Sequence, residues 1–165
     1  MKNIKICEYS EGQELFEYIK LQDLMDKEFY SASQLSSNSL DEVMLKRRLF
    51  EAQLIAYKEE SNKEIKRICV FACPGMMEKN SILNIILCNM DNVDFLKIVL
   101  DDLKKDFDYC EWTKIRISFL EYQLTDAIRK LLEIIGFEKE YTIPNINNQF
   151  MLINYCYWLK RDKNL

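Results

Sequence analysis

The chain has 165 residues, with 23 lysines and arginines against 27 aspartates and glutamates, so its formal net charge is -4. This balance provides no overall basic field and argues against bulk electrostatic capture of nucleic acid. Histidine is absent and there are only 3 glycines, which excludes catalysis by a Ser-His-Asp or Cys-His group, histidine-held zinc or haem, and the glycine-rich loops of P-loop and dinucleotide-binding proteins.

The N-terminal part predicts one strand and two helices. Lys5–Tyr9 alternates weakly and predicts a short edge strand. From Gly12 to about Tyr30, apolar residues recur every three to five positions, which is typical of an amphipathic helix. Ser31–Asn38 is rich in serine and predicts a loop. Ser39 and Glu42 then have the spacing of a capping box, which predicts the start of a second helix.

A hairpin and a buried strand are predicted next. Gln53–Lys58 and Ile68–Ala72 are strand-like, and the polar segment Glu59–Lys66 between them predicts a turn. The run Ser81–Cys88 is nearly all apolar and rich in β-branched residues. Such a short run is typical of a central strand that is buried on both faces.

Two helices and three strands are predicted in the second half. Asp91 or Asn92 can cap a helix whose apolar stripe runs over Phe95–Phe107, and Ile115–Phe119 alternates like a strand. Thr125 is a good cap for the last helix, and Gly136 stands where a left-handed C-terminal cap favours glycine. Two closing strands are expected over the ranges Phe137–Thr142 and Gln149–Leu159.

The predicted order of elements is β-α-α-β-β-β-α-β-α-β-β. It indicates an α/β (α+β) fold with a mixed central sheet of about seven strands and helices on both faces. We expect one domain over residues 1–160, followed by a charged tail at 161–165.

The cysteine pattern and the N-terminus indicate the compartment. The 6 cysteines are scattered and contain no CxxC pair, which is typical of free thiols in a cytosolic protein. The start of the chain lacks a signal-peptide core, and no apolar run reaches the ~18 residues that span a bilayer. We therefore expect a cytoplasmic protein with no metal site and neither membrane nor nucleic acid as a partner.

The segment Thr125–Glu140 resembles the GNAT superfamily of acyl-CoA-dependent N-acyltransferases. That family typically carries a helix of the form Asn-x-x-Ala-x-x-Leu-Tyr-x-x-x-Gly-Phe, and Leu131, Gly136 and Phe137 match it. The order of elements is also similar over nearly the whole chain. The resemblance implies an enzyme that moves an acyl group from acetyl-CoA or another acyl-CoA to an amine of a small molecule or a protein.

The resemblance also implies where the cofactor binds. In the family, the strand that corresponds to Ile82–Cys88 separates from its neighbour, and its free backbone groups hold the pantetheine arm. Tyr122 follows the neighbouring strand and is our candidate catalytic residue, with Glu121, Tyr109 and Asp91 as other candidate acids or bases. The positions carried over as cofactor-binding are Leu87, Cys88, Met90, Asn92, Val93, Thr125 and Arg129.

Several positions depart from the family pattern. The segment Asn89–Asp94 has neither glycine nor a basic residue, whereas the family has a glycine-rich phosphate loop there. Leu132 replaces the tyrosine that acts as general acid, and Thr125 and Ile128 replace the asparagine and alanine. A second hypothesis is therefore a GNAT-like domain that has lost the cofactor site and acts as a binding or regulatory partner. Bulky side chains between the two separating strands would favour it.

Two further features each have two interpretations. Lys46-Arg47-Arg48 is either a solvated helix face or a surface for an acidic partner, a substrate or a nucleotide phosphate. The aromatic residues Tyr155, Tyr157 and Trp158 are typical of a half-exposed strand, and they could also form the contact of a homodimer.

Overall fold

Eight strands form one mixed sheet in the part of the chain that is described. The computed structural model describes residues 3–25, 28–32, 41–75, 81–144 and 150–160. The strand order is β1-β3-β4-β5-β6-β8-β7, and β2 pairs with β5 off this path. The elements are β1 (Asn3–Ile6), η1 (Tyr9–Glu11), α1 (Gly12–Met25), β2 (Phe29–Ser31), α2 (Glu42–Phe50), β3 (Leu54–Ser61), β4 (Glu64–Ala72), β5 (Ile82–Asn89), α3 (Val93–Asp106), β6 (Lys114–Leu120), η2 (Glu121–Gln123), α4 (Asp126–Ile135), β7 (Glu138–Pro144) and β8 (Met151–Trp158).

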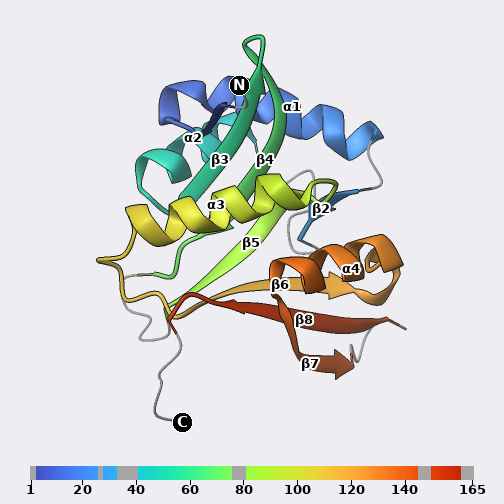
Figure 1. The fold of residues 1–165 in the computed structure, drawn as a ribbon. Helices are drawn as coiled ribbons and strands as arrows, with labels where there is room; N and C mark the ends of the chain where they lie inside the picture. The colour runs from blue at the N-terminus through green and yellow to red at the C-terminus, as the bar shows by residue number, and fades with distance from the viewer. Residues whose placement is uncertain (1–2, 26–27, 33–40, 76–80, 145–149, 161–165) are drawn as a thin grey trace.

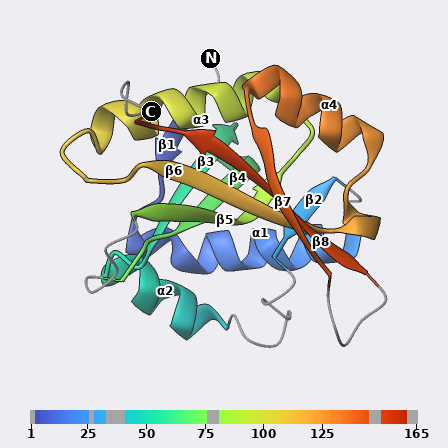
Figure 2. The ribbon, with the colours of Figure 1, turned by 90° about the horizontal axis from the view of Figure 1, so that it is seen from below.

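Helices cover both faces of the sheet, as the sequence predicts. Figures 1 and 2 show α3 and α4 on one face and α1 and α2 on the other. The larger core lies under α3 and α4, where Phe95, Val99 and Leu132 pack against the sheet. The smaller core joins Leu15 of α1 and Leu45 of α2 to β3, β4 and β5. No helix among the described residues is long and apolar enough to cross a membrane.

The caps that the sequence indicates are partly confirmed. Asn92, not Asp91, caps α3, because its Oδ1 accepts from the Phe95 amide at 2.9 Å. Thr125 caps α4, and Gly136 ends that helix with a left-handed φ of 104°. The cap of α2 is Asp41, whose side chain accepts from the Met44 amide at 2.7 Å; Ser39 lies outside the described residues.

The hairpin turn is shorter than predicted. The turn is Asn62-Lys63, with φ values of 54° and 63°, as two-residue hairpin turns require. The polar residues expected in a longer turn instead extend β3 and β4. Their charges pair across the strands: Arg67 donates to Glu59 at 2.7 Å. A polar run can therefore remain a strand when neighbouring strands neutralise it.

The sequence also misplaces the end of the first helix. α1 ends at Met25, and Phe29–Ser31 forms the short strand β2. Phe29 fits the helical spacing of α1, but β-strand structure suits aromatic residues, and an edge of β5 is available to pair with them. Of the predicted loop Ser31–Asn38, Ser31 belongs to β2 and Ala32 follows it, and residues 33–38 lie outside the described residues.

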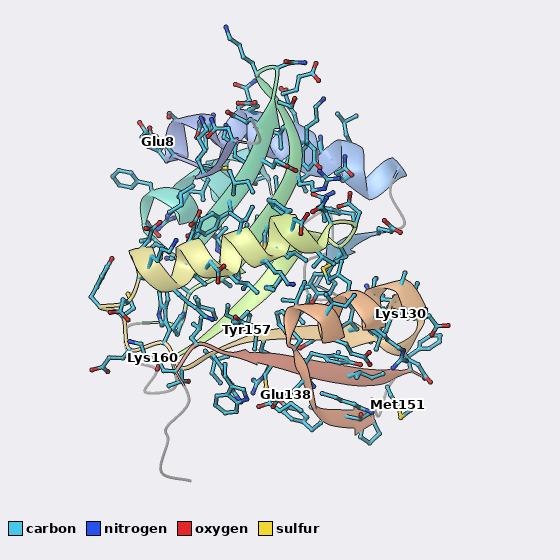
Figure 3. The ribbon with its side chains drawn as sticks, in the orientation of Figure 1. Glu8, Lys130, Glu138, Met151, Tyr157 and Lys160 are labelled. Atoms are coloured by element: carbon cyan, nitrogen blue, oxygen red, sulfur yellow. The ribbon has the colours of Figure 1, made fainter. Side chains whose placement is uncertain are left out.

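The cysteines are free as the sequence indicates, whereas the aromatic residues of β8 range from buried Tyr155 to exposed Trp158. All six cysteines are free, and Cys7, Cys69, Cys88 and Cys156 are buried. Tyr157 lies between β8 and α3 (Figure 3). There, Lys104 Nζ donates to its hydroxyl at 2.6 Å.

A buried ion-pair network ties η1 to β3. The Lys58 side chain is 0% exposed and contacts Glu60 and Glu11, the latter at 2.7 Å. The carboxylates of Glu11, Glu14 and Glu60 lie close together, and the Lys58 ammonium lies among them. Burial alone would raise the pKa of Glu11, but the hydrogen bond from Lys58 holds that pKa below its usual range. The hydrogen bond from Lys58 likewise lowers the pKa of Glu60.

These pKa shifts predict loss of stability in acid. A carboxyl group whose folded-state pKa is lowered stabilises the fold above its unfolded pKa of about 4.3 and loses this contribution as the pH falls through the folded pKa. We expect the unfolding temperature to drop between about pH 5 and pH 3, and Glu60→Gln to flatten that dependence. Thermal unfolding followed by circular dichroism measures this. Glu17→Gln, an exposed change on α1, is the control, and equal slopes for the two variants would contradict the assignment.

Candidate functional site

The parallel strands β5 and β6 pair only at their beginnings. Their register runs from Ile82 opposite Lys114 to Asn84 opposite Arg116. β5 then continues to Asn89 and β6 to Leu120 without further pairing between them. Figure 1 shows the two strands diverging toward their carboxyl ends. The separation that the family resemblance implies is therefore present, at the end of the sheet where open α/β folds place ligands.

β2 occupies part of this gap. Its residues lie opposite Leu87, Cys88 and Asn89 of β5, and β4 covers the other edge of β5, so β2 lies on the edge that faces β6. The ladder is extended by two backbone hydrogen bonds: the Ala32 amide donates to the Ile86 carbonyl at 2.8 Å, and the Met90 amide donates to the Glu28 carbonyl at 2.9 Å. Backbone groups expected to be free for a pantetheine arm are thus bound to β2.

Tyr30 of β2 bridges the two separating strands. Its backbone pairs with Cys88 of β5, and its hydroxyl donates to the Ser118 carbonyl of β6 at 2.6 Å. Its ring lies 4.9 Å from the ring of Phe119, measured between centroids. Burial raises the pKa of Tyr30 well above its usual range, so the hydroxyl stays protonated and serves as a hydrogen-bond donor.

Two cavities meet at Tyr30, one on each face of the sheet. The α4 cavity has a volume of about 340 Å³ and is lined by Phe29, Tyr30, Phe119, Tyr122, Gln123, Thr125 and Ile128. The β8 cavity has a volume of about 520 Å³ and is lined by Tyr30, Ala32, Arg48, Ala72, Asn84, Ile85, Ile86, Arg116, Ser118, Tyr141, Ile143, Leu152 and Asn154. They open on opposite faces because Ser118 and Phe119, adjacent on β6, point to opposite sides.

Two of the predicted site residues come together in the α4 cavity. Tyr122 belongs to η2, is 63% exposed, and has its ring 5.0 Å from that of Phe150. Thr125 caps α4 beside it, and both line the cavity. Arg129 lies one turn further along α4 and is half-buried, without lining either cavity.

The other predicted positions lie on β5 and at the start of α3. Leu87, Cys88 and Met90 are buried, and burial raises the pKa of the Cys88 thiol well above its usual range. A thiolate nucleophile is therefore not favoured at Cys88. Val93 is the first residue of α3, after the cap Asn92.

The first turn of α3 is arranged unlike a phosphate-binding loop. A free helix N-terminus binds anions through its unpaired amides, but here the side chain of Asn92 accepts from the Phe95 amide. Asp91 is held by Arg67, whose Nη2 donates to Asp91 Oδ2 at 2.7 Å. Leu132, at the position of the family's tyrosine, is 1% exposed within the core and has no proton to donate.

The residues fit the flexible arm of an acyl thioester on the α4 side of the gap. There, the apolar residues Phe29, Phe119 and Ile128 line the cavity together with the hydroxyl-bearing residues Tyr122 and Thr125, a mixture that suits an arm with both apolar and amide groups. The β5 edge fits such an arm only when β2 is detached from it, because β2 makes the same backbone hydrogen bonds.

Sequence reasoning missed β2 and the β8 cavity. The sequence does contain a sign of the cavity, because polar residues interrupt otherwise apolar strands. These residues are Asn84 in β5, Arg116 and Ser118 in β6, and Asn154 in β8. Such residues in a buried strand point to a cavity or a polar network.

Comparison with known proteins finds similarity in structure only. Neither a scan against protein-family models nor a search of curated proteins gives a match. Solved structures match over nearly the whole chain. An acetyltransferase of the GNAT family from Streptococcus pneumoniae aligns with a TM-score of 0.71 and 12% identity, covering 96% of this chain and 99% of that one. This chain has the GNAT fold.

Two further structural neighbours are acetyltransferases whose ligand or substrate is described. A putative acetyltransferase from Salmonella typhimurium, solved with its cofactor acetyl-CoA, aligns with a TM-score of 0.66 and 10% identity over 100% of this chain and 98% of that one. The Salmonella typhimurium enzyme that modifies the N-terminal serine of ribosomal protein L7/L12 aligns with a TM-score of 0.65 and 10% identity, covering 94% and 93%.

Proposed function

We propose that the chain is an N-acyltransferase that moves an acyl group from an acyl-CoA to an amine of a small molecule or a protein. The observation that carries the proposal is the gap between β5 and β6, with one cavity on each face of the sheet and both in contact with Tyr30. Acyl transfer needs two substrates that approach one point from different sides, and this arrangement provides two such approaches.

The structural neighbours support the choice of substrates. One neighbour was solved with acetyl-CoA, and another acts on the amino terminus of a ribosomal protein. For this chain, the proposal includes acyl-CoA as donor and an amine as acceptor. It also includes a homodimer contact through the exposed part of β8 and a cytoplasmic location.

The α4 cavity would hold the donor. Acyl-CoA, when bound, supplies an activated thioester. Phe29 and Phe119 would exclude water from it, and Thr125 Oγ1 would offer a hydrogen bond to its amide groups. Tyr122 Oη would donate a proton to the leaving sulfur, the task that a general acid performs in this reaction. Tyr122 thereby takes the role that Leu132 cannot fill.

β2 must leave the edge of β5 before a thioester arm can occupy it. The observed pairing of β2 with β5 is then the closed state, and the apparent affinity for acyl-CoA is reduced by the fraction of molecules in which β2 is detached. Weakening the β2 ladder should increase this fraction and hence the affinity.

Ala32→Pro tests this directly. Proline removes the Ala32 amide that donates to Ile86, and such a bond has a net worth of about 0.5–1.5 kcal/mol. We therefore expect Ala32→Pro to bind acetyl-CoA up to about tenfold more tightly than the wild type. Ser31→Pro is the matched control. Ser31 and Leu87 form a non-hydrogen-bonded pair of the antiparallel ladder, so a proline at Ser31 removes no hydrogen bond to β5.

Calorimetric titration with acetyl-CoA measures binding. Release of free thiol from acetyl-CoA in the presence of a panel of amines measures acyl transfer. Equal affinity of the two proline variants would contradict the displacement of β2. Absence of saturable binding at millimolar acetyl-CoA in the wild type and in both variants would overturn the proposed activity itself.

Two observations favour a second candidate, a GNAT-fold binding domain without a cofactor. The β5 edge is paired with β2, and Asn92 caps the helix end where phosphate would bind. For this candidate, acyl-CoA leaves the unfolding temperature unchanged in the wild type and in Ala32→Pro, whereas a ligand of the native state must raise it.

A further inference from the structure

We infer that the β8 cavity binds an amine that also carries an anionic oxygen group, a carboxylate or a phosphate. The anionic part of this inference stands on the cavity itself. The amine part rests on the proposed function, in which this cavity holds the acceptor.

The walls of the β8 cavity are positively charged in an acidic protein. Arg48 and Arg116 both line it, and its lining includes no aspartate or glutamate among the described residues, although the chain has a net charge of -4. On α2, Lys46 pairs with Glu42 and Arg47 pairs with Glu51. Arg48 has no ion pair within the described part of the chain, so its charge is available to a ligand.

Arg116 is held in a fixed orientation at the cavity wall. Its Nε donates to Glu140 Oε2 at 3.1 Å, and its guanidinium lies 5.5 Å from the centre of the Tyr141 ring. Its two Nη groups have no partner among the residues described. Glu140 also contacts Lys114. An oriented guanidinium with free Nη groups is the donor that matches the two oxygens of a carboxylate or phosphate.

Asn154 provides an independent observation. It is 2% exposed on β8, and its Oδ1 accepts from the Ser118 hydroxyl. Its Nδ2 is buried and has no hydrogen-bond partner within the described residues. Buried polar atoms are nearly always satisfied, and Asn154 is one of the residues that line the cavity, so its unpaired amide donor points to an oxygen of a ligand.

The anion site and the gap between the strands belong to one cavity. Ser118 connects them, since its hydroxyl binds Asn154 and its carbonyl accepts from Tyr30. A volume of about 520 Å³ lies within the range of small-molecule sites. A small amine can therefore contact the arginines with its anionic group while its other end reaches the gap.

Direct binding to the full chain without acyl-CoA tests this inference. The probes are matched pairs: each of the common amino acids against its carboxamide, and phosphoethanolamine against ethanolamine, with binding followed by saturation-transfer NMR and calorimetry. The test variant is Arg48→Gln. Its control is Arg47→Gln, the adjacent residue, which is exposed and paired with Glu51. Thermal unfolding verifies that both variants are folded.

We expect at least one anionic probe to bind ten times or more tighter than its uncharged partner, because charge-assisted hydrogen bonds contribute that much. Arg48→Gln should remove this preference and Arg47→Gln should keep it. Preference among amino acids assigns a carboxylate, and preference for phosphoethanolamine assigns a phosphate. Binding of no probe, equal binding within every pair, or equal behaviour of the two variants overturns the inference.

The proposed acyl transfer and the proposed anion site can be contradicted independently of each other. Selective binding of an anionic amine without thiol release from acetyl-CoA would remove the proposed activity and leave the anion site. Turnover with uncharged amines alone would support the activity and overturn the anion site.

Discussion

Replacing Phe119 by alanine should lower the free energy of unfolding by about 3–5 kcal/mol. Phe119 is 0% exposed, and its ring lies 4.9 Å from that of Tyr30 and 6.2 Å from that of Tyr155. Beyond Arg116, β6 has no backbone pairing with β5, so side-chain packing connects the two strands there. Removing the ring leaves a void between β2, β6 and β8.

Urea unfolding followed by tryptophan fluorescence measures this loss. Phe50→Ala is the matched control, because Phe50 is a phenylalanine that also contacts an aromatic ring, that of Tyr9, but is exposed at the end of α2. We expect the control to cost less than about 1 kcal/mol. If Phe119→Ala cost no more than Phe50→Ala, the packing that bridges the gap would not be a main contributor to stability.

Replacing Tyr122 by phenylalanine should lower the rate of acyl transfer by about 10²-fold or more. Tyr122 lines the α4 cavity, and its hydroxyl has no hydrogen-bond partner in the described part of the chain. The variant therefore removes a proton donor and little else, so the unfolding temperature should stay unchanged. The turnover number with acetyl-CoA and the best amine of the panel is the measurement.

Tyr109→Phe is the control for this variant. Tyr109 is another exposed tyrosine with an aromatic neighbour, Phe107 at 6.2 Å. The sequence suggests it as a further acid near Tyr122, but the structure places it after α3, at the opposite end of β6 from Tyr122. Equal turnover of Tyr122→Phe and Tyr109→Phe would show that another group protonates the leaving sulfur.

The parts of the fold that local chemistry determines could be predicted from the sequence. Thr125 and Gly136 mark the two ends of α4 because an N-cap and a left-handed C-cap each depend on a few neighbouring residues. The separation of β5 from β6 followed from the family resemblance, whose order of elements the structure shares.

The parts that depend on distant contacts could not. Phe29 and Tyr30 suit a helix by spacing, and they form a strand only because β6 diverges and leaves an edge of β5 available. The polarity of Glu59 and Glu60 predicts a turn, yet both lie in β3, where Glu59 contacts Arg67 and Glu60 contacts Lys58.

The candidate site divides in the same way. Tyr122 and Thr125 are close in sequence and follow one strand, so their place in the α4 cavity could be anticipated. The β8 cavity combines Arg48 of α2, Arg116 of β6 and Asn154 of β8, which only the folded sheet brings together.

Amide hydrogen exchange with and without saturating acetyl-CoA tests most directly whether the thioester arm replaces β2. If the arm replaces β2, the Ala32 amide, which donates to Ile86, loses protection when acetyl-CoA binds. The Cys7 amide donates to the Ala56 carbonyl at 2.7 Å and lies away from the gap, so it should keep its protection. Undiminished protection of Ala32 in the acetyl-CoA complex would show that β2 stays paired with β5 and that the arm binds elsewhere.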